Sequence, residues 1–318
     1  MKLISFIIPC YNSSKTLESV IKEIKDTVFK IEGYDYEIIL VNDYSPDGVY
    51  EVIKKLCYSD SKIKGIKLSK NFGQQAAIMA GLNIANGEII TLLDDDGQIA
   101  ICELGKLINK LDEGYDVVYG KYSEKKQSFV RNIGSKINEK MTNLLIDKPK
   151  DIYISSFYVC RRYVIEEVIK YNNPYPYLYG LILRVTKNIA NVEVPHRDRK
   201  NGKSNYTLKK LFGLWLNGFT AFSVKPLRVA TITGIICAVL GFCVGIYTII
   251  NKLVNPETPA GYSSTMAVLL FIGGMIMLML GLIGEYIGRI YISINNSPQY
   301  VIREAINIYD ELEMKREQ

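Results

Sequence analysis

The sequence predicts an α/β protein in which a Rossmann-like, mostly parallel sheet is followed by a two-helix membrane hairpin. Two features of the 318-residue chain support this prediction. Between residues 3 and 120, short apolar stretches rich in β-branched residues alternate with amphipathic ones. After residue 228, the chain contains two long runs without a charged side chain.

The first 120 residues alternate between strand-like and helix-like segments. The expected strands are short apolar stretches, at Leu3–Pro9, Glu37–Asn42, Ile63–Ser69, Glu88–Asp94 and Asp116–Gly120. The expected helices are amphipathic, at Thr16–Lys30, Asp47–Tyr58, Gln74–Ala85 and Glu103–Leu111. Apolar strands separated by helices indicate a parallel sheet covered on both faces. The N-terminal stretch is too short for a signal peptide, so we expect it to form the first strand.

The two uncharged runs cover residues 229–250 and 264–284, which are 22 and 21 residues. Each can cross about 30 Å of hydrocarbon as a helix, which takes roughly 20 residues. Two such runs in succession argue against buried core helices. Lys225 and Arg228 precede the first run, and Arg289 follows the second. By the positive-inside rule, these flanks predict a multi-pass protein of the cell membrane with a cytoplasmic N-terminal domain.

The segment before the hairpin is basic and amphipathic. From His196 to Arg228 it carries eight Lys or Arg and one Asp, a net charge of +7, against +6 for the whole chain. Such a local excess is typical of a helix at a membrane interface, and the mild total charge does not indicate nucleic acid as a partner. We therefore expect a cytoplasmic domain (1–206), an interfacial helix (207–227), the hairpin (228–292) and a cytoplasmic tail (293–318).

Two further patterns bear on assembly and compartment. Small residues recur four apart in the spans, at Gly234/Ala238, Gly241/Gly245 and Gly284/Gly288. This spacing suits close helix packing, either within the hairpin or between subunits of a homo-oligomer. The six cysteines include no C-x-x-C pair, which predicts free thiols in a reducing compartment.

Polar and acidic residues follow four of the expected strands. They form the runs P-C-Y-N (9–12), N-D-Y-S-P-D-G (42–48), K-N-F-G-Q (70–74) and D-D-D-G-Q (94–98). Ligands of parallel sheets bind at the carboxyl ends of the strands, so we expect a site at this edge. Neither G-x-G-x-x-G nor a P-loop motif is present in the sequence, which disfavours a dinucleotide site and a P-loop.

The strongest chemical signal is the run Asp94–Asp95–Asp96 directly after an apolar strand. Three adjacent carboxylates repel one another unless a cation or solvent screens them. Oxygen ligands suit Mg²⁺ or Mn²⁺, which use one or two carboxylates together with substrate phosphates. The alternative is a solvated loop or a helix N-cap, where Asp is common. The position at the end of a buried strand, among other polar loops, favours the metal site.

Together these motifs resemble the family 2 glycosyltransferases with the GT-A fold. The resemblance rests on I-P-C-Y-N, E-I-I-L-V-N-D-Y-S-P-D-G, S-K-N-F-G-Q-Q-A-A-I-M-A-G and L-L-D-D-D-G-Q, in this order. The later R-D-R-K-N-G-K-S-N-Y (197–206), the interfacial segment and the hairpin are similar to polyprenyl-phosphate glycosyltransferases, relatives of dolichol-phosphate mannose synthase. The match extends over essentially the whole chain.

The resemblance implies a role for individual residues. Those expected to bind the nucleotide sugar are Pro9, Tyr11, Asn12, Glu18, Asp43, Asn71, Gly73, Asp94 and Asp95. Asp96 and Gln98 match the metal ligands of the family, so the implied cofactor is Mg²⁺ or Mn²⁺, and the catalytic set is Asp94, Asp96, Gln98 and Arg199. The acceptor and its phosphate would contact Lys121, Arg131, Ser156, Arg197, Arg199, Lys203, Ser204 and Tyr206. Lys121 stands where relatives often carry Arg, whose planar fork binds phosphate differently.

One departure from the family pattern concerns Ser156, which stands where many relatives carry an Asp in a G-D-F-R segment. Either activity is altered or that carboxylate is dispensable. A phosphate monoester has a second pKa near 6, so the acceptor reaches the site already ionised near pH 7. A general base gains little when no proton needs removal, which favours a dispensable carboxylate. The lone histidine, His196, is expected to have no chemical role.

The expected function is therefore inverting transfer of a sugar from a nucleotide donor to polyprenyl phosphate, for example undecaprenyl phosphate. A UDP-sugar is favoured over a guanosine donor by analogy with bacterial relatives. The first alternative is a membrane glycosyltransferase that acts on a glycan or glycolipid hydroxyl, which would need a general base. The second is a non-catalytic scaffold that binds nucleotide sugar. Processive synthases are disfavoured because their Q-x-x-R-W element is absent from the sequence.

Overall fold

The computed structural model describes residues 1–122, 149, 151–195, 225–255, 261–295 and 297–308. The chain forms two compact units, and each is treated by itself. The first, here called the sheet domain, contains Met1–Tyr206 together with Ser297–Gln318. The second, the hairpin unit, contains Thr207–Asn296.

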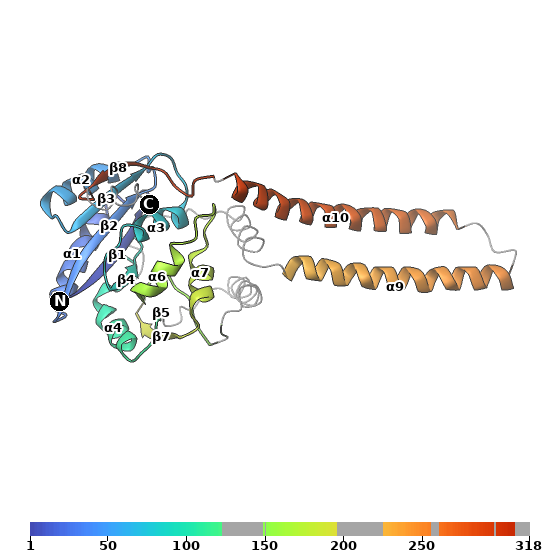
Figure 1. The fold of residues 1–318 in the computed structure, drawn as a ribbon, viewed down its shortest axis with the longest axis horizontal. Helices are drawn as coiled ribbons and strands as arrows, with labels where there is room; N and C mark the ends of the chain where they lie inside the picture. Colours follow the sequence, from blue (N-terminus) through green and yellow to red (C-terminus); the bar gives the residue numbers. More distant parts are fainter. Residues whose placement is uncertain (123–148, 150, 196–224, 256–260, 296, 309–318) are drawn as a thin grey trace. The chain divides into compact units, whose positions relative to one another are not determined.

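The sheet domain is built on one mostly parallel sheet, whose strand order among the described residues is β7-β5-β6-β4-β1-β2-β3-β8 (Figure 1). The four strands β4, β1, β2 and β3 are parallel neighbours, whereas β6 is antiparallel to β4 and β5, and β8 is antiparallel to β3. The strands are β1 Lys2–Cys10, β2 Tyr34–Asn42, β3 Ile63–Leu68, β4 Ile89–Leu92, β5 Val117–Tyr122, β6 Tyr158–Arg161, β7 Ile189–Val194 and β8 Ile302–Ile306.

Helices cover both faces of this sheet. In the sheet domain they are α1 Leu17–Val28, α2 Val49–Ser59, α3 Gln74–Leu82, α4 Leu104–Asp112, α6 Arg162–Val168 and α7 Leu178–Val185, with the short 3₁₀ turn η1 Ile101–Glu103 before α4. Apolar residues of α1, α2 and α4 pack with Phe6 and Ile8 of β1 on one face. On the other face α3 lies close to the sheet, because a Cβ on Gly81 would lie only 2.7 Å from Ile7 Cγ2.

The predicted α/β fold with a mostly parallel sheet is confirmed. All five expected strands and all four expected helices are present, with ends that shift by a few residues. Five further elements were not predicted: strands β6, β7 and β8 and helices α6 and α7. The antiparallel β6 inserts between β4 and β5, so β5 is not the direct neighbour of β4 that chain order suggests.

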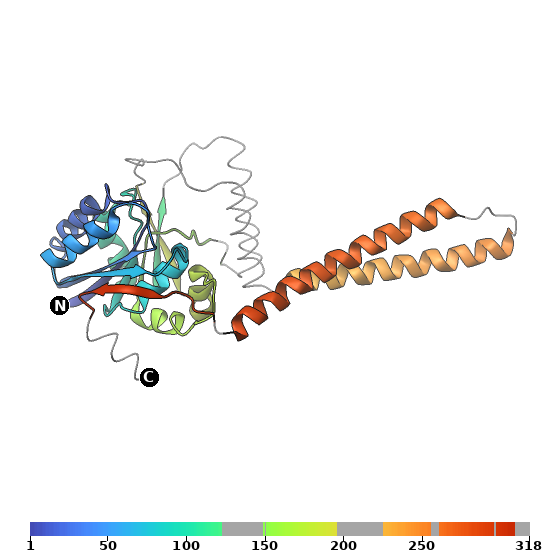
Figure 2. The same cartoon turned by 90° about the horizontal axis from the view of Figure 1, so that it is seen from above.

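The C-terminal segment returns to the sheet domain after the hairpin. Residues 302–306 form β8 at the sheet edge, antiparallel to β3 (Figure 2). Lys67 of β3 pairs with Glu304 at 3.1 Å. The Asn307 side chain then donates to the carbonyl oxygens of Cys57 (2.9 Å) and Ile63 (2.8 Å). The expected cytoplasmic tail therefore contains a strand of the sheet.

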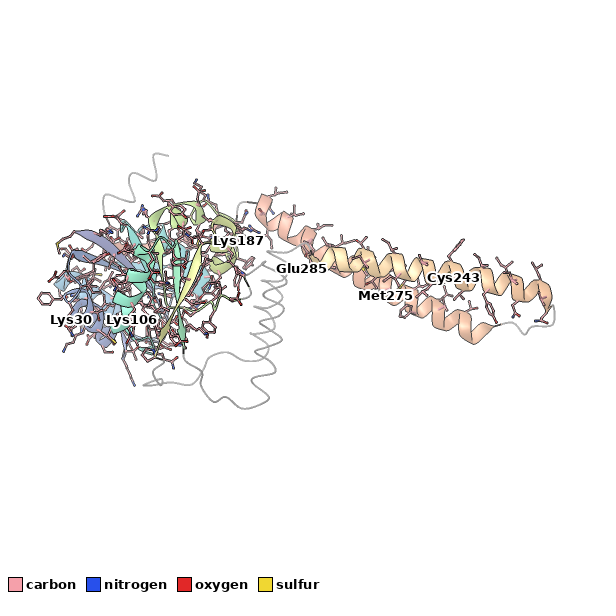
Figure 3. The ribbon with its side chains drawn as sticks, turned by 90° about the horizontal axis from the view of Figure 1, so that it is seen from below. Lys30, Lys106, Lys187, Cys243, Met275 and Glu285 are labelled. Carbon is pink, nitrogen blue, oxygen red and sulfur yellow. The ribbon has the colours of Figure 1, made fainter. Side chains whose placement is uncertain are left out.

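The hairpin unit contains two long helices, α9 Lys225–Val254 and α10 Tyr262–Ile294. Within them, Ala230–Asn251 and Phe271–Ile294 are long and apolar enough to cross a membrane. Neither window is buried by the rest of the protein. Figure 3 contrasts the two units: Lys30, Lys106 and Lys187 lie on the sheet domain, whereas Cys243 and Met275 lie on the long helices. The predicted spans, 229–250 and 264–284, fall within these helices.

Candidate active site

Four polar loops meet at the carboxyl edge of the sheet. The ends of β1 and β2 are in register, with Cys10 opposite Asn42, and Ile7 of β1 lies opposite Leu92 of β4. The loops that follow these strands therefore start side by side, as the parallel arrangement predicts. The hydrogen bonds between these loops show which polar groups hold the four loops together.

Asp95 joins the β4 loop to the β1 loop. Its Oδ2 accepts the backbone N–H of Tyr11 at 3.0 Å, and its carbonyl oxygen accepts the Thr16 hydroxyl at 2.6 Å. Burial raises the pKa of Asp95 to about 6, and the charges of Asp94 and Asp96 add to this shift, whereas the hydrogen bond from the Tyr11 N–H opposes it. Asp95 thus fixes the position of Tyr11, for which a nucleotide contact is expected.

Asp43 has a similar role between the β2 loop and the start of α3. Its two carboxylate oxygens accept the backbone N–H groups of Phe72 (2.7 Å) and Gly73 (2.9 Å). Asn71 donates its side-chain amide to the Asp43 carbonyl oxygen at 3.1 Å. Burial raises the pKa of Asp43, while the two N–H donors oppose the shift. Gly73 has a φ of +90°, a conformation that favours glycine.

A third connection, made by Ser45 and Asp47, was not predicted. Ser45 Oγ accepts the backbone N–H of Asn12 at 2.8 Å and donates to Asp47 Oδ1 at 2.7 Å. Asp47 Oδ2 accepts the backbone N–H of Ser14 at 3.0 Å. Both acceptors lie in the N-D-Y-S-P-D-G run, whose density of small polar residues is the sequence signal for such loop contacts.

Asp94, Asp96 and Gln98 form the part of the edge that fits a divalent cation. Gln74 donates its side-chain amide to Asp94 Oδ1 at 3.2 Å, and Asp96 Oδ1 accepts the backbone N–H of Gln98 at 3.0 Å. Two carboxylates and an amide match the oxygen ligands that Mg²⁺ and Mn²⁺ use alongside substrate phosphates. In the described part of the chain, no three His, Cys, Asp or Glu residues form a self-sufficient metal site. The ligand set fits an ion shared with a substrate.

Two residues at the end of β5, Lys121 and Tyr122, lie at the carboxyl edge of the sheet. Tyr122 is half-buried, and burial, together with the charges of Asp94, Tyr153 and Asp96, raises its pKa to about 12. Lys121 precedes Tyr122 in the strand and is exposed.

The remaining expected donor residues lie on or beside this edge. Pro9 is buried near the end of β1, whereas Tyr11 and Asn12 are exposed in the following loop. Glu18 is exposed in the first turn of α1. The expected residues outside the described part of the chain are Arg131, Arg197, Arg199, Lys203, Ser204 and Tyr206, together with most of the interfacial segment 207–227.

Comparison with known protein families decides the assignment. Residues 5–169 match the model of glycosyl transferase family 2, and residues 225–290 match a GtrB C-terminal hairpin. The chain belongs to glycosyl transferase family 2. It is therefore a glycosyltransferase enzyme, and the resemblance inferred from its motifs is confirmed.

Relatives match this glycosyltransferase along nearly its whole length. The Bacillus subtilis protein CsbB is 35% identical, over 95% of the chain and 92% of the relative. A bactoprenol glucosyl transferase of Shigella flexneri is 31% identical, over 95% of the chain and 98% of the relative. An undecaprenyl-phosphate 4-deoxy-4-formamido-L-arabinose transferase of Proteus mirabilis is 30% identical, over 96% of the chain and 94% of the relative.

Among solved structures, the sheet domain has a fold similar to that of glucosyl-3-phosphoglycerate synthase of Mycobacterium tuberculosis. That enzyme was crystallised with Mn²⁺, UDP and phosphoglyceric acid. Its TM-score is 0.52 at 18% identity, over 69% of this chain and 76% of that one. This likeness supports the GT-A assignment of the sheet domain.

Proposed function

We propose that this family 2 glycosyltransferase moves a sugar from a nucleotide donor, with UDP-sugars favoured, to a polyprenyl phosphate such as undecaprenyl phosphate. The observation that carries the proposal is the pairing of two features in one chain. Asp94, Asp96 and Gln98 form an oxygen-rich cluster at the sheet edge, and two unburied apolar helices follow the sheet domain. A lipid acceptor explains both features. Relatives named for bactoprenol and undecaprenyl phosphate, matched over at least 95% of this chain, support it.

The donor would lie across the carboxyl edge of β1, β2 and β4. Tyr11 and Asn12 sit where the base and ribose are expected, and Asp95, Asp47 and Ser45 hold their backbone in place. A pre-ordered loop binds a nucleotide with a smaller entropic penalty than a loop that must be ordered on binding.

The acidic run at the end of β4 would face the donor diphosphate. Asp96 and Gln98 would hold Mg²⁺ or Mn²⁺, which when bound supplies positive charge that stabilises the leaving nucleotide diphosphate. The solved neighbour crystallised with Mn²⁺ and UDP is consistent with such a cofactor. Asp94, which accepts the Gln74 amide, would help to orient this end of the donor.

The chemical step would be a single displacement that inverts the anomeric centre. A lipid phosphate oxygen forms the new bond to the anomeric carbon as the bond to the nucleotide diphosphate breaks. The acceptor is already ionised, so this chain has to supply positive charge rather than a base. Lys121, Arg131, Arg197, Arg199 and Lys203 would provide that charge, with Ser204 and Tyr206 completing the acceptor loop.

The hydroxyl-acceptor alternative is weaker because of Ser156. Transfer to a glycan hydroxyl requires removal of a proton, and Ser156 offers no carboxylate to accept it. The scaffold alternative is disfavoured by the cluster of Asp94, Asp96 and Gln98, which has the ligand types of a working metal site.

The deciding experiment incubates purified protein in detergent with a panel of labelled nucleotide sugars, with and without undecaprenyl phosphate. We expect nucleoside diphosphate release and a lipid-linked sugar only when both substrates are present. EDTA should abolish the transfer, added Mg²⁺ or Mn²⁺ should restore it, and Asp96→Ala should lose several orders of magnitude in rate. Transfer to a glycan without lipid phosphate, or full activity in EDTA, would contradict the proposal.

A further inference from the structure

A tyrosine-rich loop of the sheet domain is bound to the segment that follows the hairpin. The loop covers residues 171–177 (Y-N-N-P-Y-P-Y), carries no charged side chain and precedes α7. Gln299, between α10 and β8, donates its side-chain amide to the carbonyl oxygens of Tyr171 (3.2 Å) and Asn173 (2.9 Å). The first half of the loop is therefore fixed to the chain that has just left the hairpin.

The other end of the loop is fixed at the carboxyl edge of the sheet. The backbone N–H of Leu178, the first residue of α7, donates to Gln75 Oε1 at 3.0 Å. Gln74, which precedes Gln75 at the start of α3, donates to Asp94 Oδ1 at 3.2 Å. The loop is thus tied at one end to the segment after the hairpin and at the other to the edge where the donor is expected to bind.

The middle of the loop presents an exposed aromatic ring. Tyr175 lies between Pro174 and Pro176 and is 59% exposed. Its φ is +58°, a left-handed conformation that is unfavourable for a bulky side chain. Backbone strain of this kind is often kept at positions that contact a ligand or a partner. An exposed ring in a loop that is fixed at both ends indicates a contact outside the sheet domain.

Chain length indicates that the partner is the membrane. The candidate span Phe271–Ile294 ends five residues before Gln299. Five residues extend over at most about 18 Å, so the loop bound to Gln299 stays close to the point where the chain leaves the bilayer. Tyrosine is enriched at membrane–water interfaces, because its ring suits the apolar side of the boundary and its hydroxyl the polar side. An uncharged loop places such a ring there without desolvating a charge.

We propose that the loop 171–177 is a membrane-surface contact of the sheet domain, separate from the hairpin and from the basic segment before it, with the Tyr175 ring at the headgroup level of the bilayer. The inference rests on the hairpin entering the membrane, which the proposed function also requires, and not on the identity of the sugar or the nucleotide. Through Gln75, the contact orients the carboxyl edge of the sheet towards the surface where a lipid phosphate lies.

The test is quenching of a single tryptophan by brominated lipids in proteoliposomes of the full chain. Trp215→Phe removes the only native tryptophan, and Tyr175→Trp is made in this background. We expect its fluorescence to fall more in phosphatidylcholine brominated near the headgroup end of the acyl chain than in phosphatidylcholine brominated near the middle. Asn172→Trp, at an exposed position of the same loop, repeats the measurement without changing the strained residue.

Two further variants in the same background are the controls. Tyr58→Trp, at a 79% exposed position near the end of α2, lies before β3 at the opposite edge of the sheet and should not be quenched. Phe242→Trp, within the candidate span Ala230–Asn251, should be quenched most by lipid brominated near the middle of the chain.

The controls separate failure of the inference from failure of the proposed function. If Phe242→Trp is quenched while both loop variants behave like Tyr58→Trp, the inference is overturned and the proposed lipid acceptor stands. If Phe242→Trp escapes quenching, the hairpin is not in lipid, and the inference fails together with the proposed function.

Discussion

At the scale of single residues, three acidic side chains hold the loops of the edge together. Asp43, Asp47 and Asp95 each accept backbone N–H groups from a neighbouring loop. Hydrogen bonds to charged acceptors are stronger than neutral ones, so few contacts suffice to fix the loops. Acidic residues of this edge therefore divide into those that shape the site and those, Asp94 and Asp96, that are expected to face the donor.

Asp47→Ala tests the shaping role at a position with no predicted ligand contact. The variant leaves the N–H groups of Ser14 and Val49 and the Ser45 hydroxyl without their acceptor. We expect the KM for the nucleotide sugar to rise about tenfold, equivalent to about 1.4 kcal/mol, while the KM for undecaprenyl phosphate is unchanged. Steady-state kinetics with each substrate varied would measure this. Asp26→Ala, at an exposed position of α1, is the control, and equal donor KM values for both variants would refute the role.

Ser156→Ala tests whether the group in place of the family Asp takes part in proton transfer. Because the acceptor phosphate is already ionised, the variant should lose at most one hydrogen bond, which contributes roughly 0.5–1.5 kcal/mol. This corresponds to a loss of at most about tenfold in kcat. The measurement is kcat against pH with saturating undecaprenyl phosphate, and the profile should keep its shape. A thousandfold loss with donor binding intact would show that Ser156 is chemically essential.

Asp60 provides a test of stability against pH away from the site. Burial alone would raise its pKa, but hydrogen bonds from Lys25, the Lys62 backbone and Tyr36 outweigh burial and lower it. A lowered folded-state pKa gives stability that is present above the unfolded pKa of about 3.9 and is lost as pH falls through the folded value. Asp60→Asn should therefore lower the Tm at pH 7, and the difference should shrink as the pH falls below the unfolded pKa of about 3.9. A difference that is the same at pH 7 and pH 3 would contradict this.

At the scale of elements, β8 covers the edge of β3, which would otherwise expose unpaired backbone groups. Asn307 follows β8 with φ at +61°, a conformation that Asn tolerates, and its two side-chain bonds reach the carbonyls of Cys57 and Ile63. Ile308 beyond it is buried. The C-terminal segment is therefore anchored to the sheet by specific contacts.

Asn307→Ala should lower the stability of the sheet domain by about 1–3 kcal/mol, because two carbonyl acceptors lose their donor. Asn307→Gly keeps the backbone conformation accessible and loses the same bonds, so it separates strain from hydrogen bonding. Thermal unfolding of the full chain in detergent would measure both. Arg303→Ala, at an exposed position of β8, is the control. An equal Tm for Asn307→Ala and Arg303→Ala would show that the anchor contributes nothing.

The sequence predicted the first half of the fold well, because there each element is marked locally. Apolar strands such as Ile89–Leu92 and amphipathic helices such as Leu104–Asp112 are recognisable from spacing alone. The strands that were missed take their place from distant contacts. β6 is four residues long and pairs with strands about 40 to 70 residues away, and β8 pairs with β3 across the whole hairpin.

The same division holds within the site. The run Asp94–Asp96 was found because it is contiguous and follows a strand. The hydrogen bond from the Tyr11 N–H to Asp95 was not predicted, because the two residues are 84 apart in sequence. Tyr122 belongs to no family motif, so the influence of Asp94 and Asp96 on it was not predicted.

At the scale of the whole molecule, chain connectivity restricts how the hairpin crosses a membrane. The chain leaves the sheet domain before α9 and rejoins it as β8 after α10. The two outer ends of the hairpin therefore have to be on the same side, which requires an even number of crossings. Chain connectivity does not tell which side this is, but the positive-inside rule predicts the cytoplasmic side, with the connector outside.

Cysteine labelling would test this orientation. The exposed native Cys102 reports on the sheet domain, and Asn255→Cys, made in a Cys102→Ser background, reports on the end of α9 next to the connector. With a membrane-impermeant maleimide on spheroplasts, we expect Asn255→Cys to be labelled directly and Cys102 only after permeabilisation. Cys243 lies within the span, so the Cys102→Ser background alone should remain unlabelled on intact spheroplasts.

Each alternative arrangement gives a different pattern. Direct labelling of Cys102 with a silent Asn255→Cys would mean an inverted protein, whose donor site could not reach a cytoplasmic nucleotide sugar. Labelling of both positions only after permeabilisation would mean that the hairpin enters the membrane without crossing it. In that case the hairpin would cross the membrane zero times, which also leaves its two ends on the same side. The two unburied helices would then have to be covered by other copies of the protein or by one leaflet of the membrane. Only labelling of the connector side alone agrees with a spanning hairpin and a sheet domain on the cytoplasmic side.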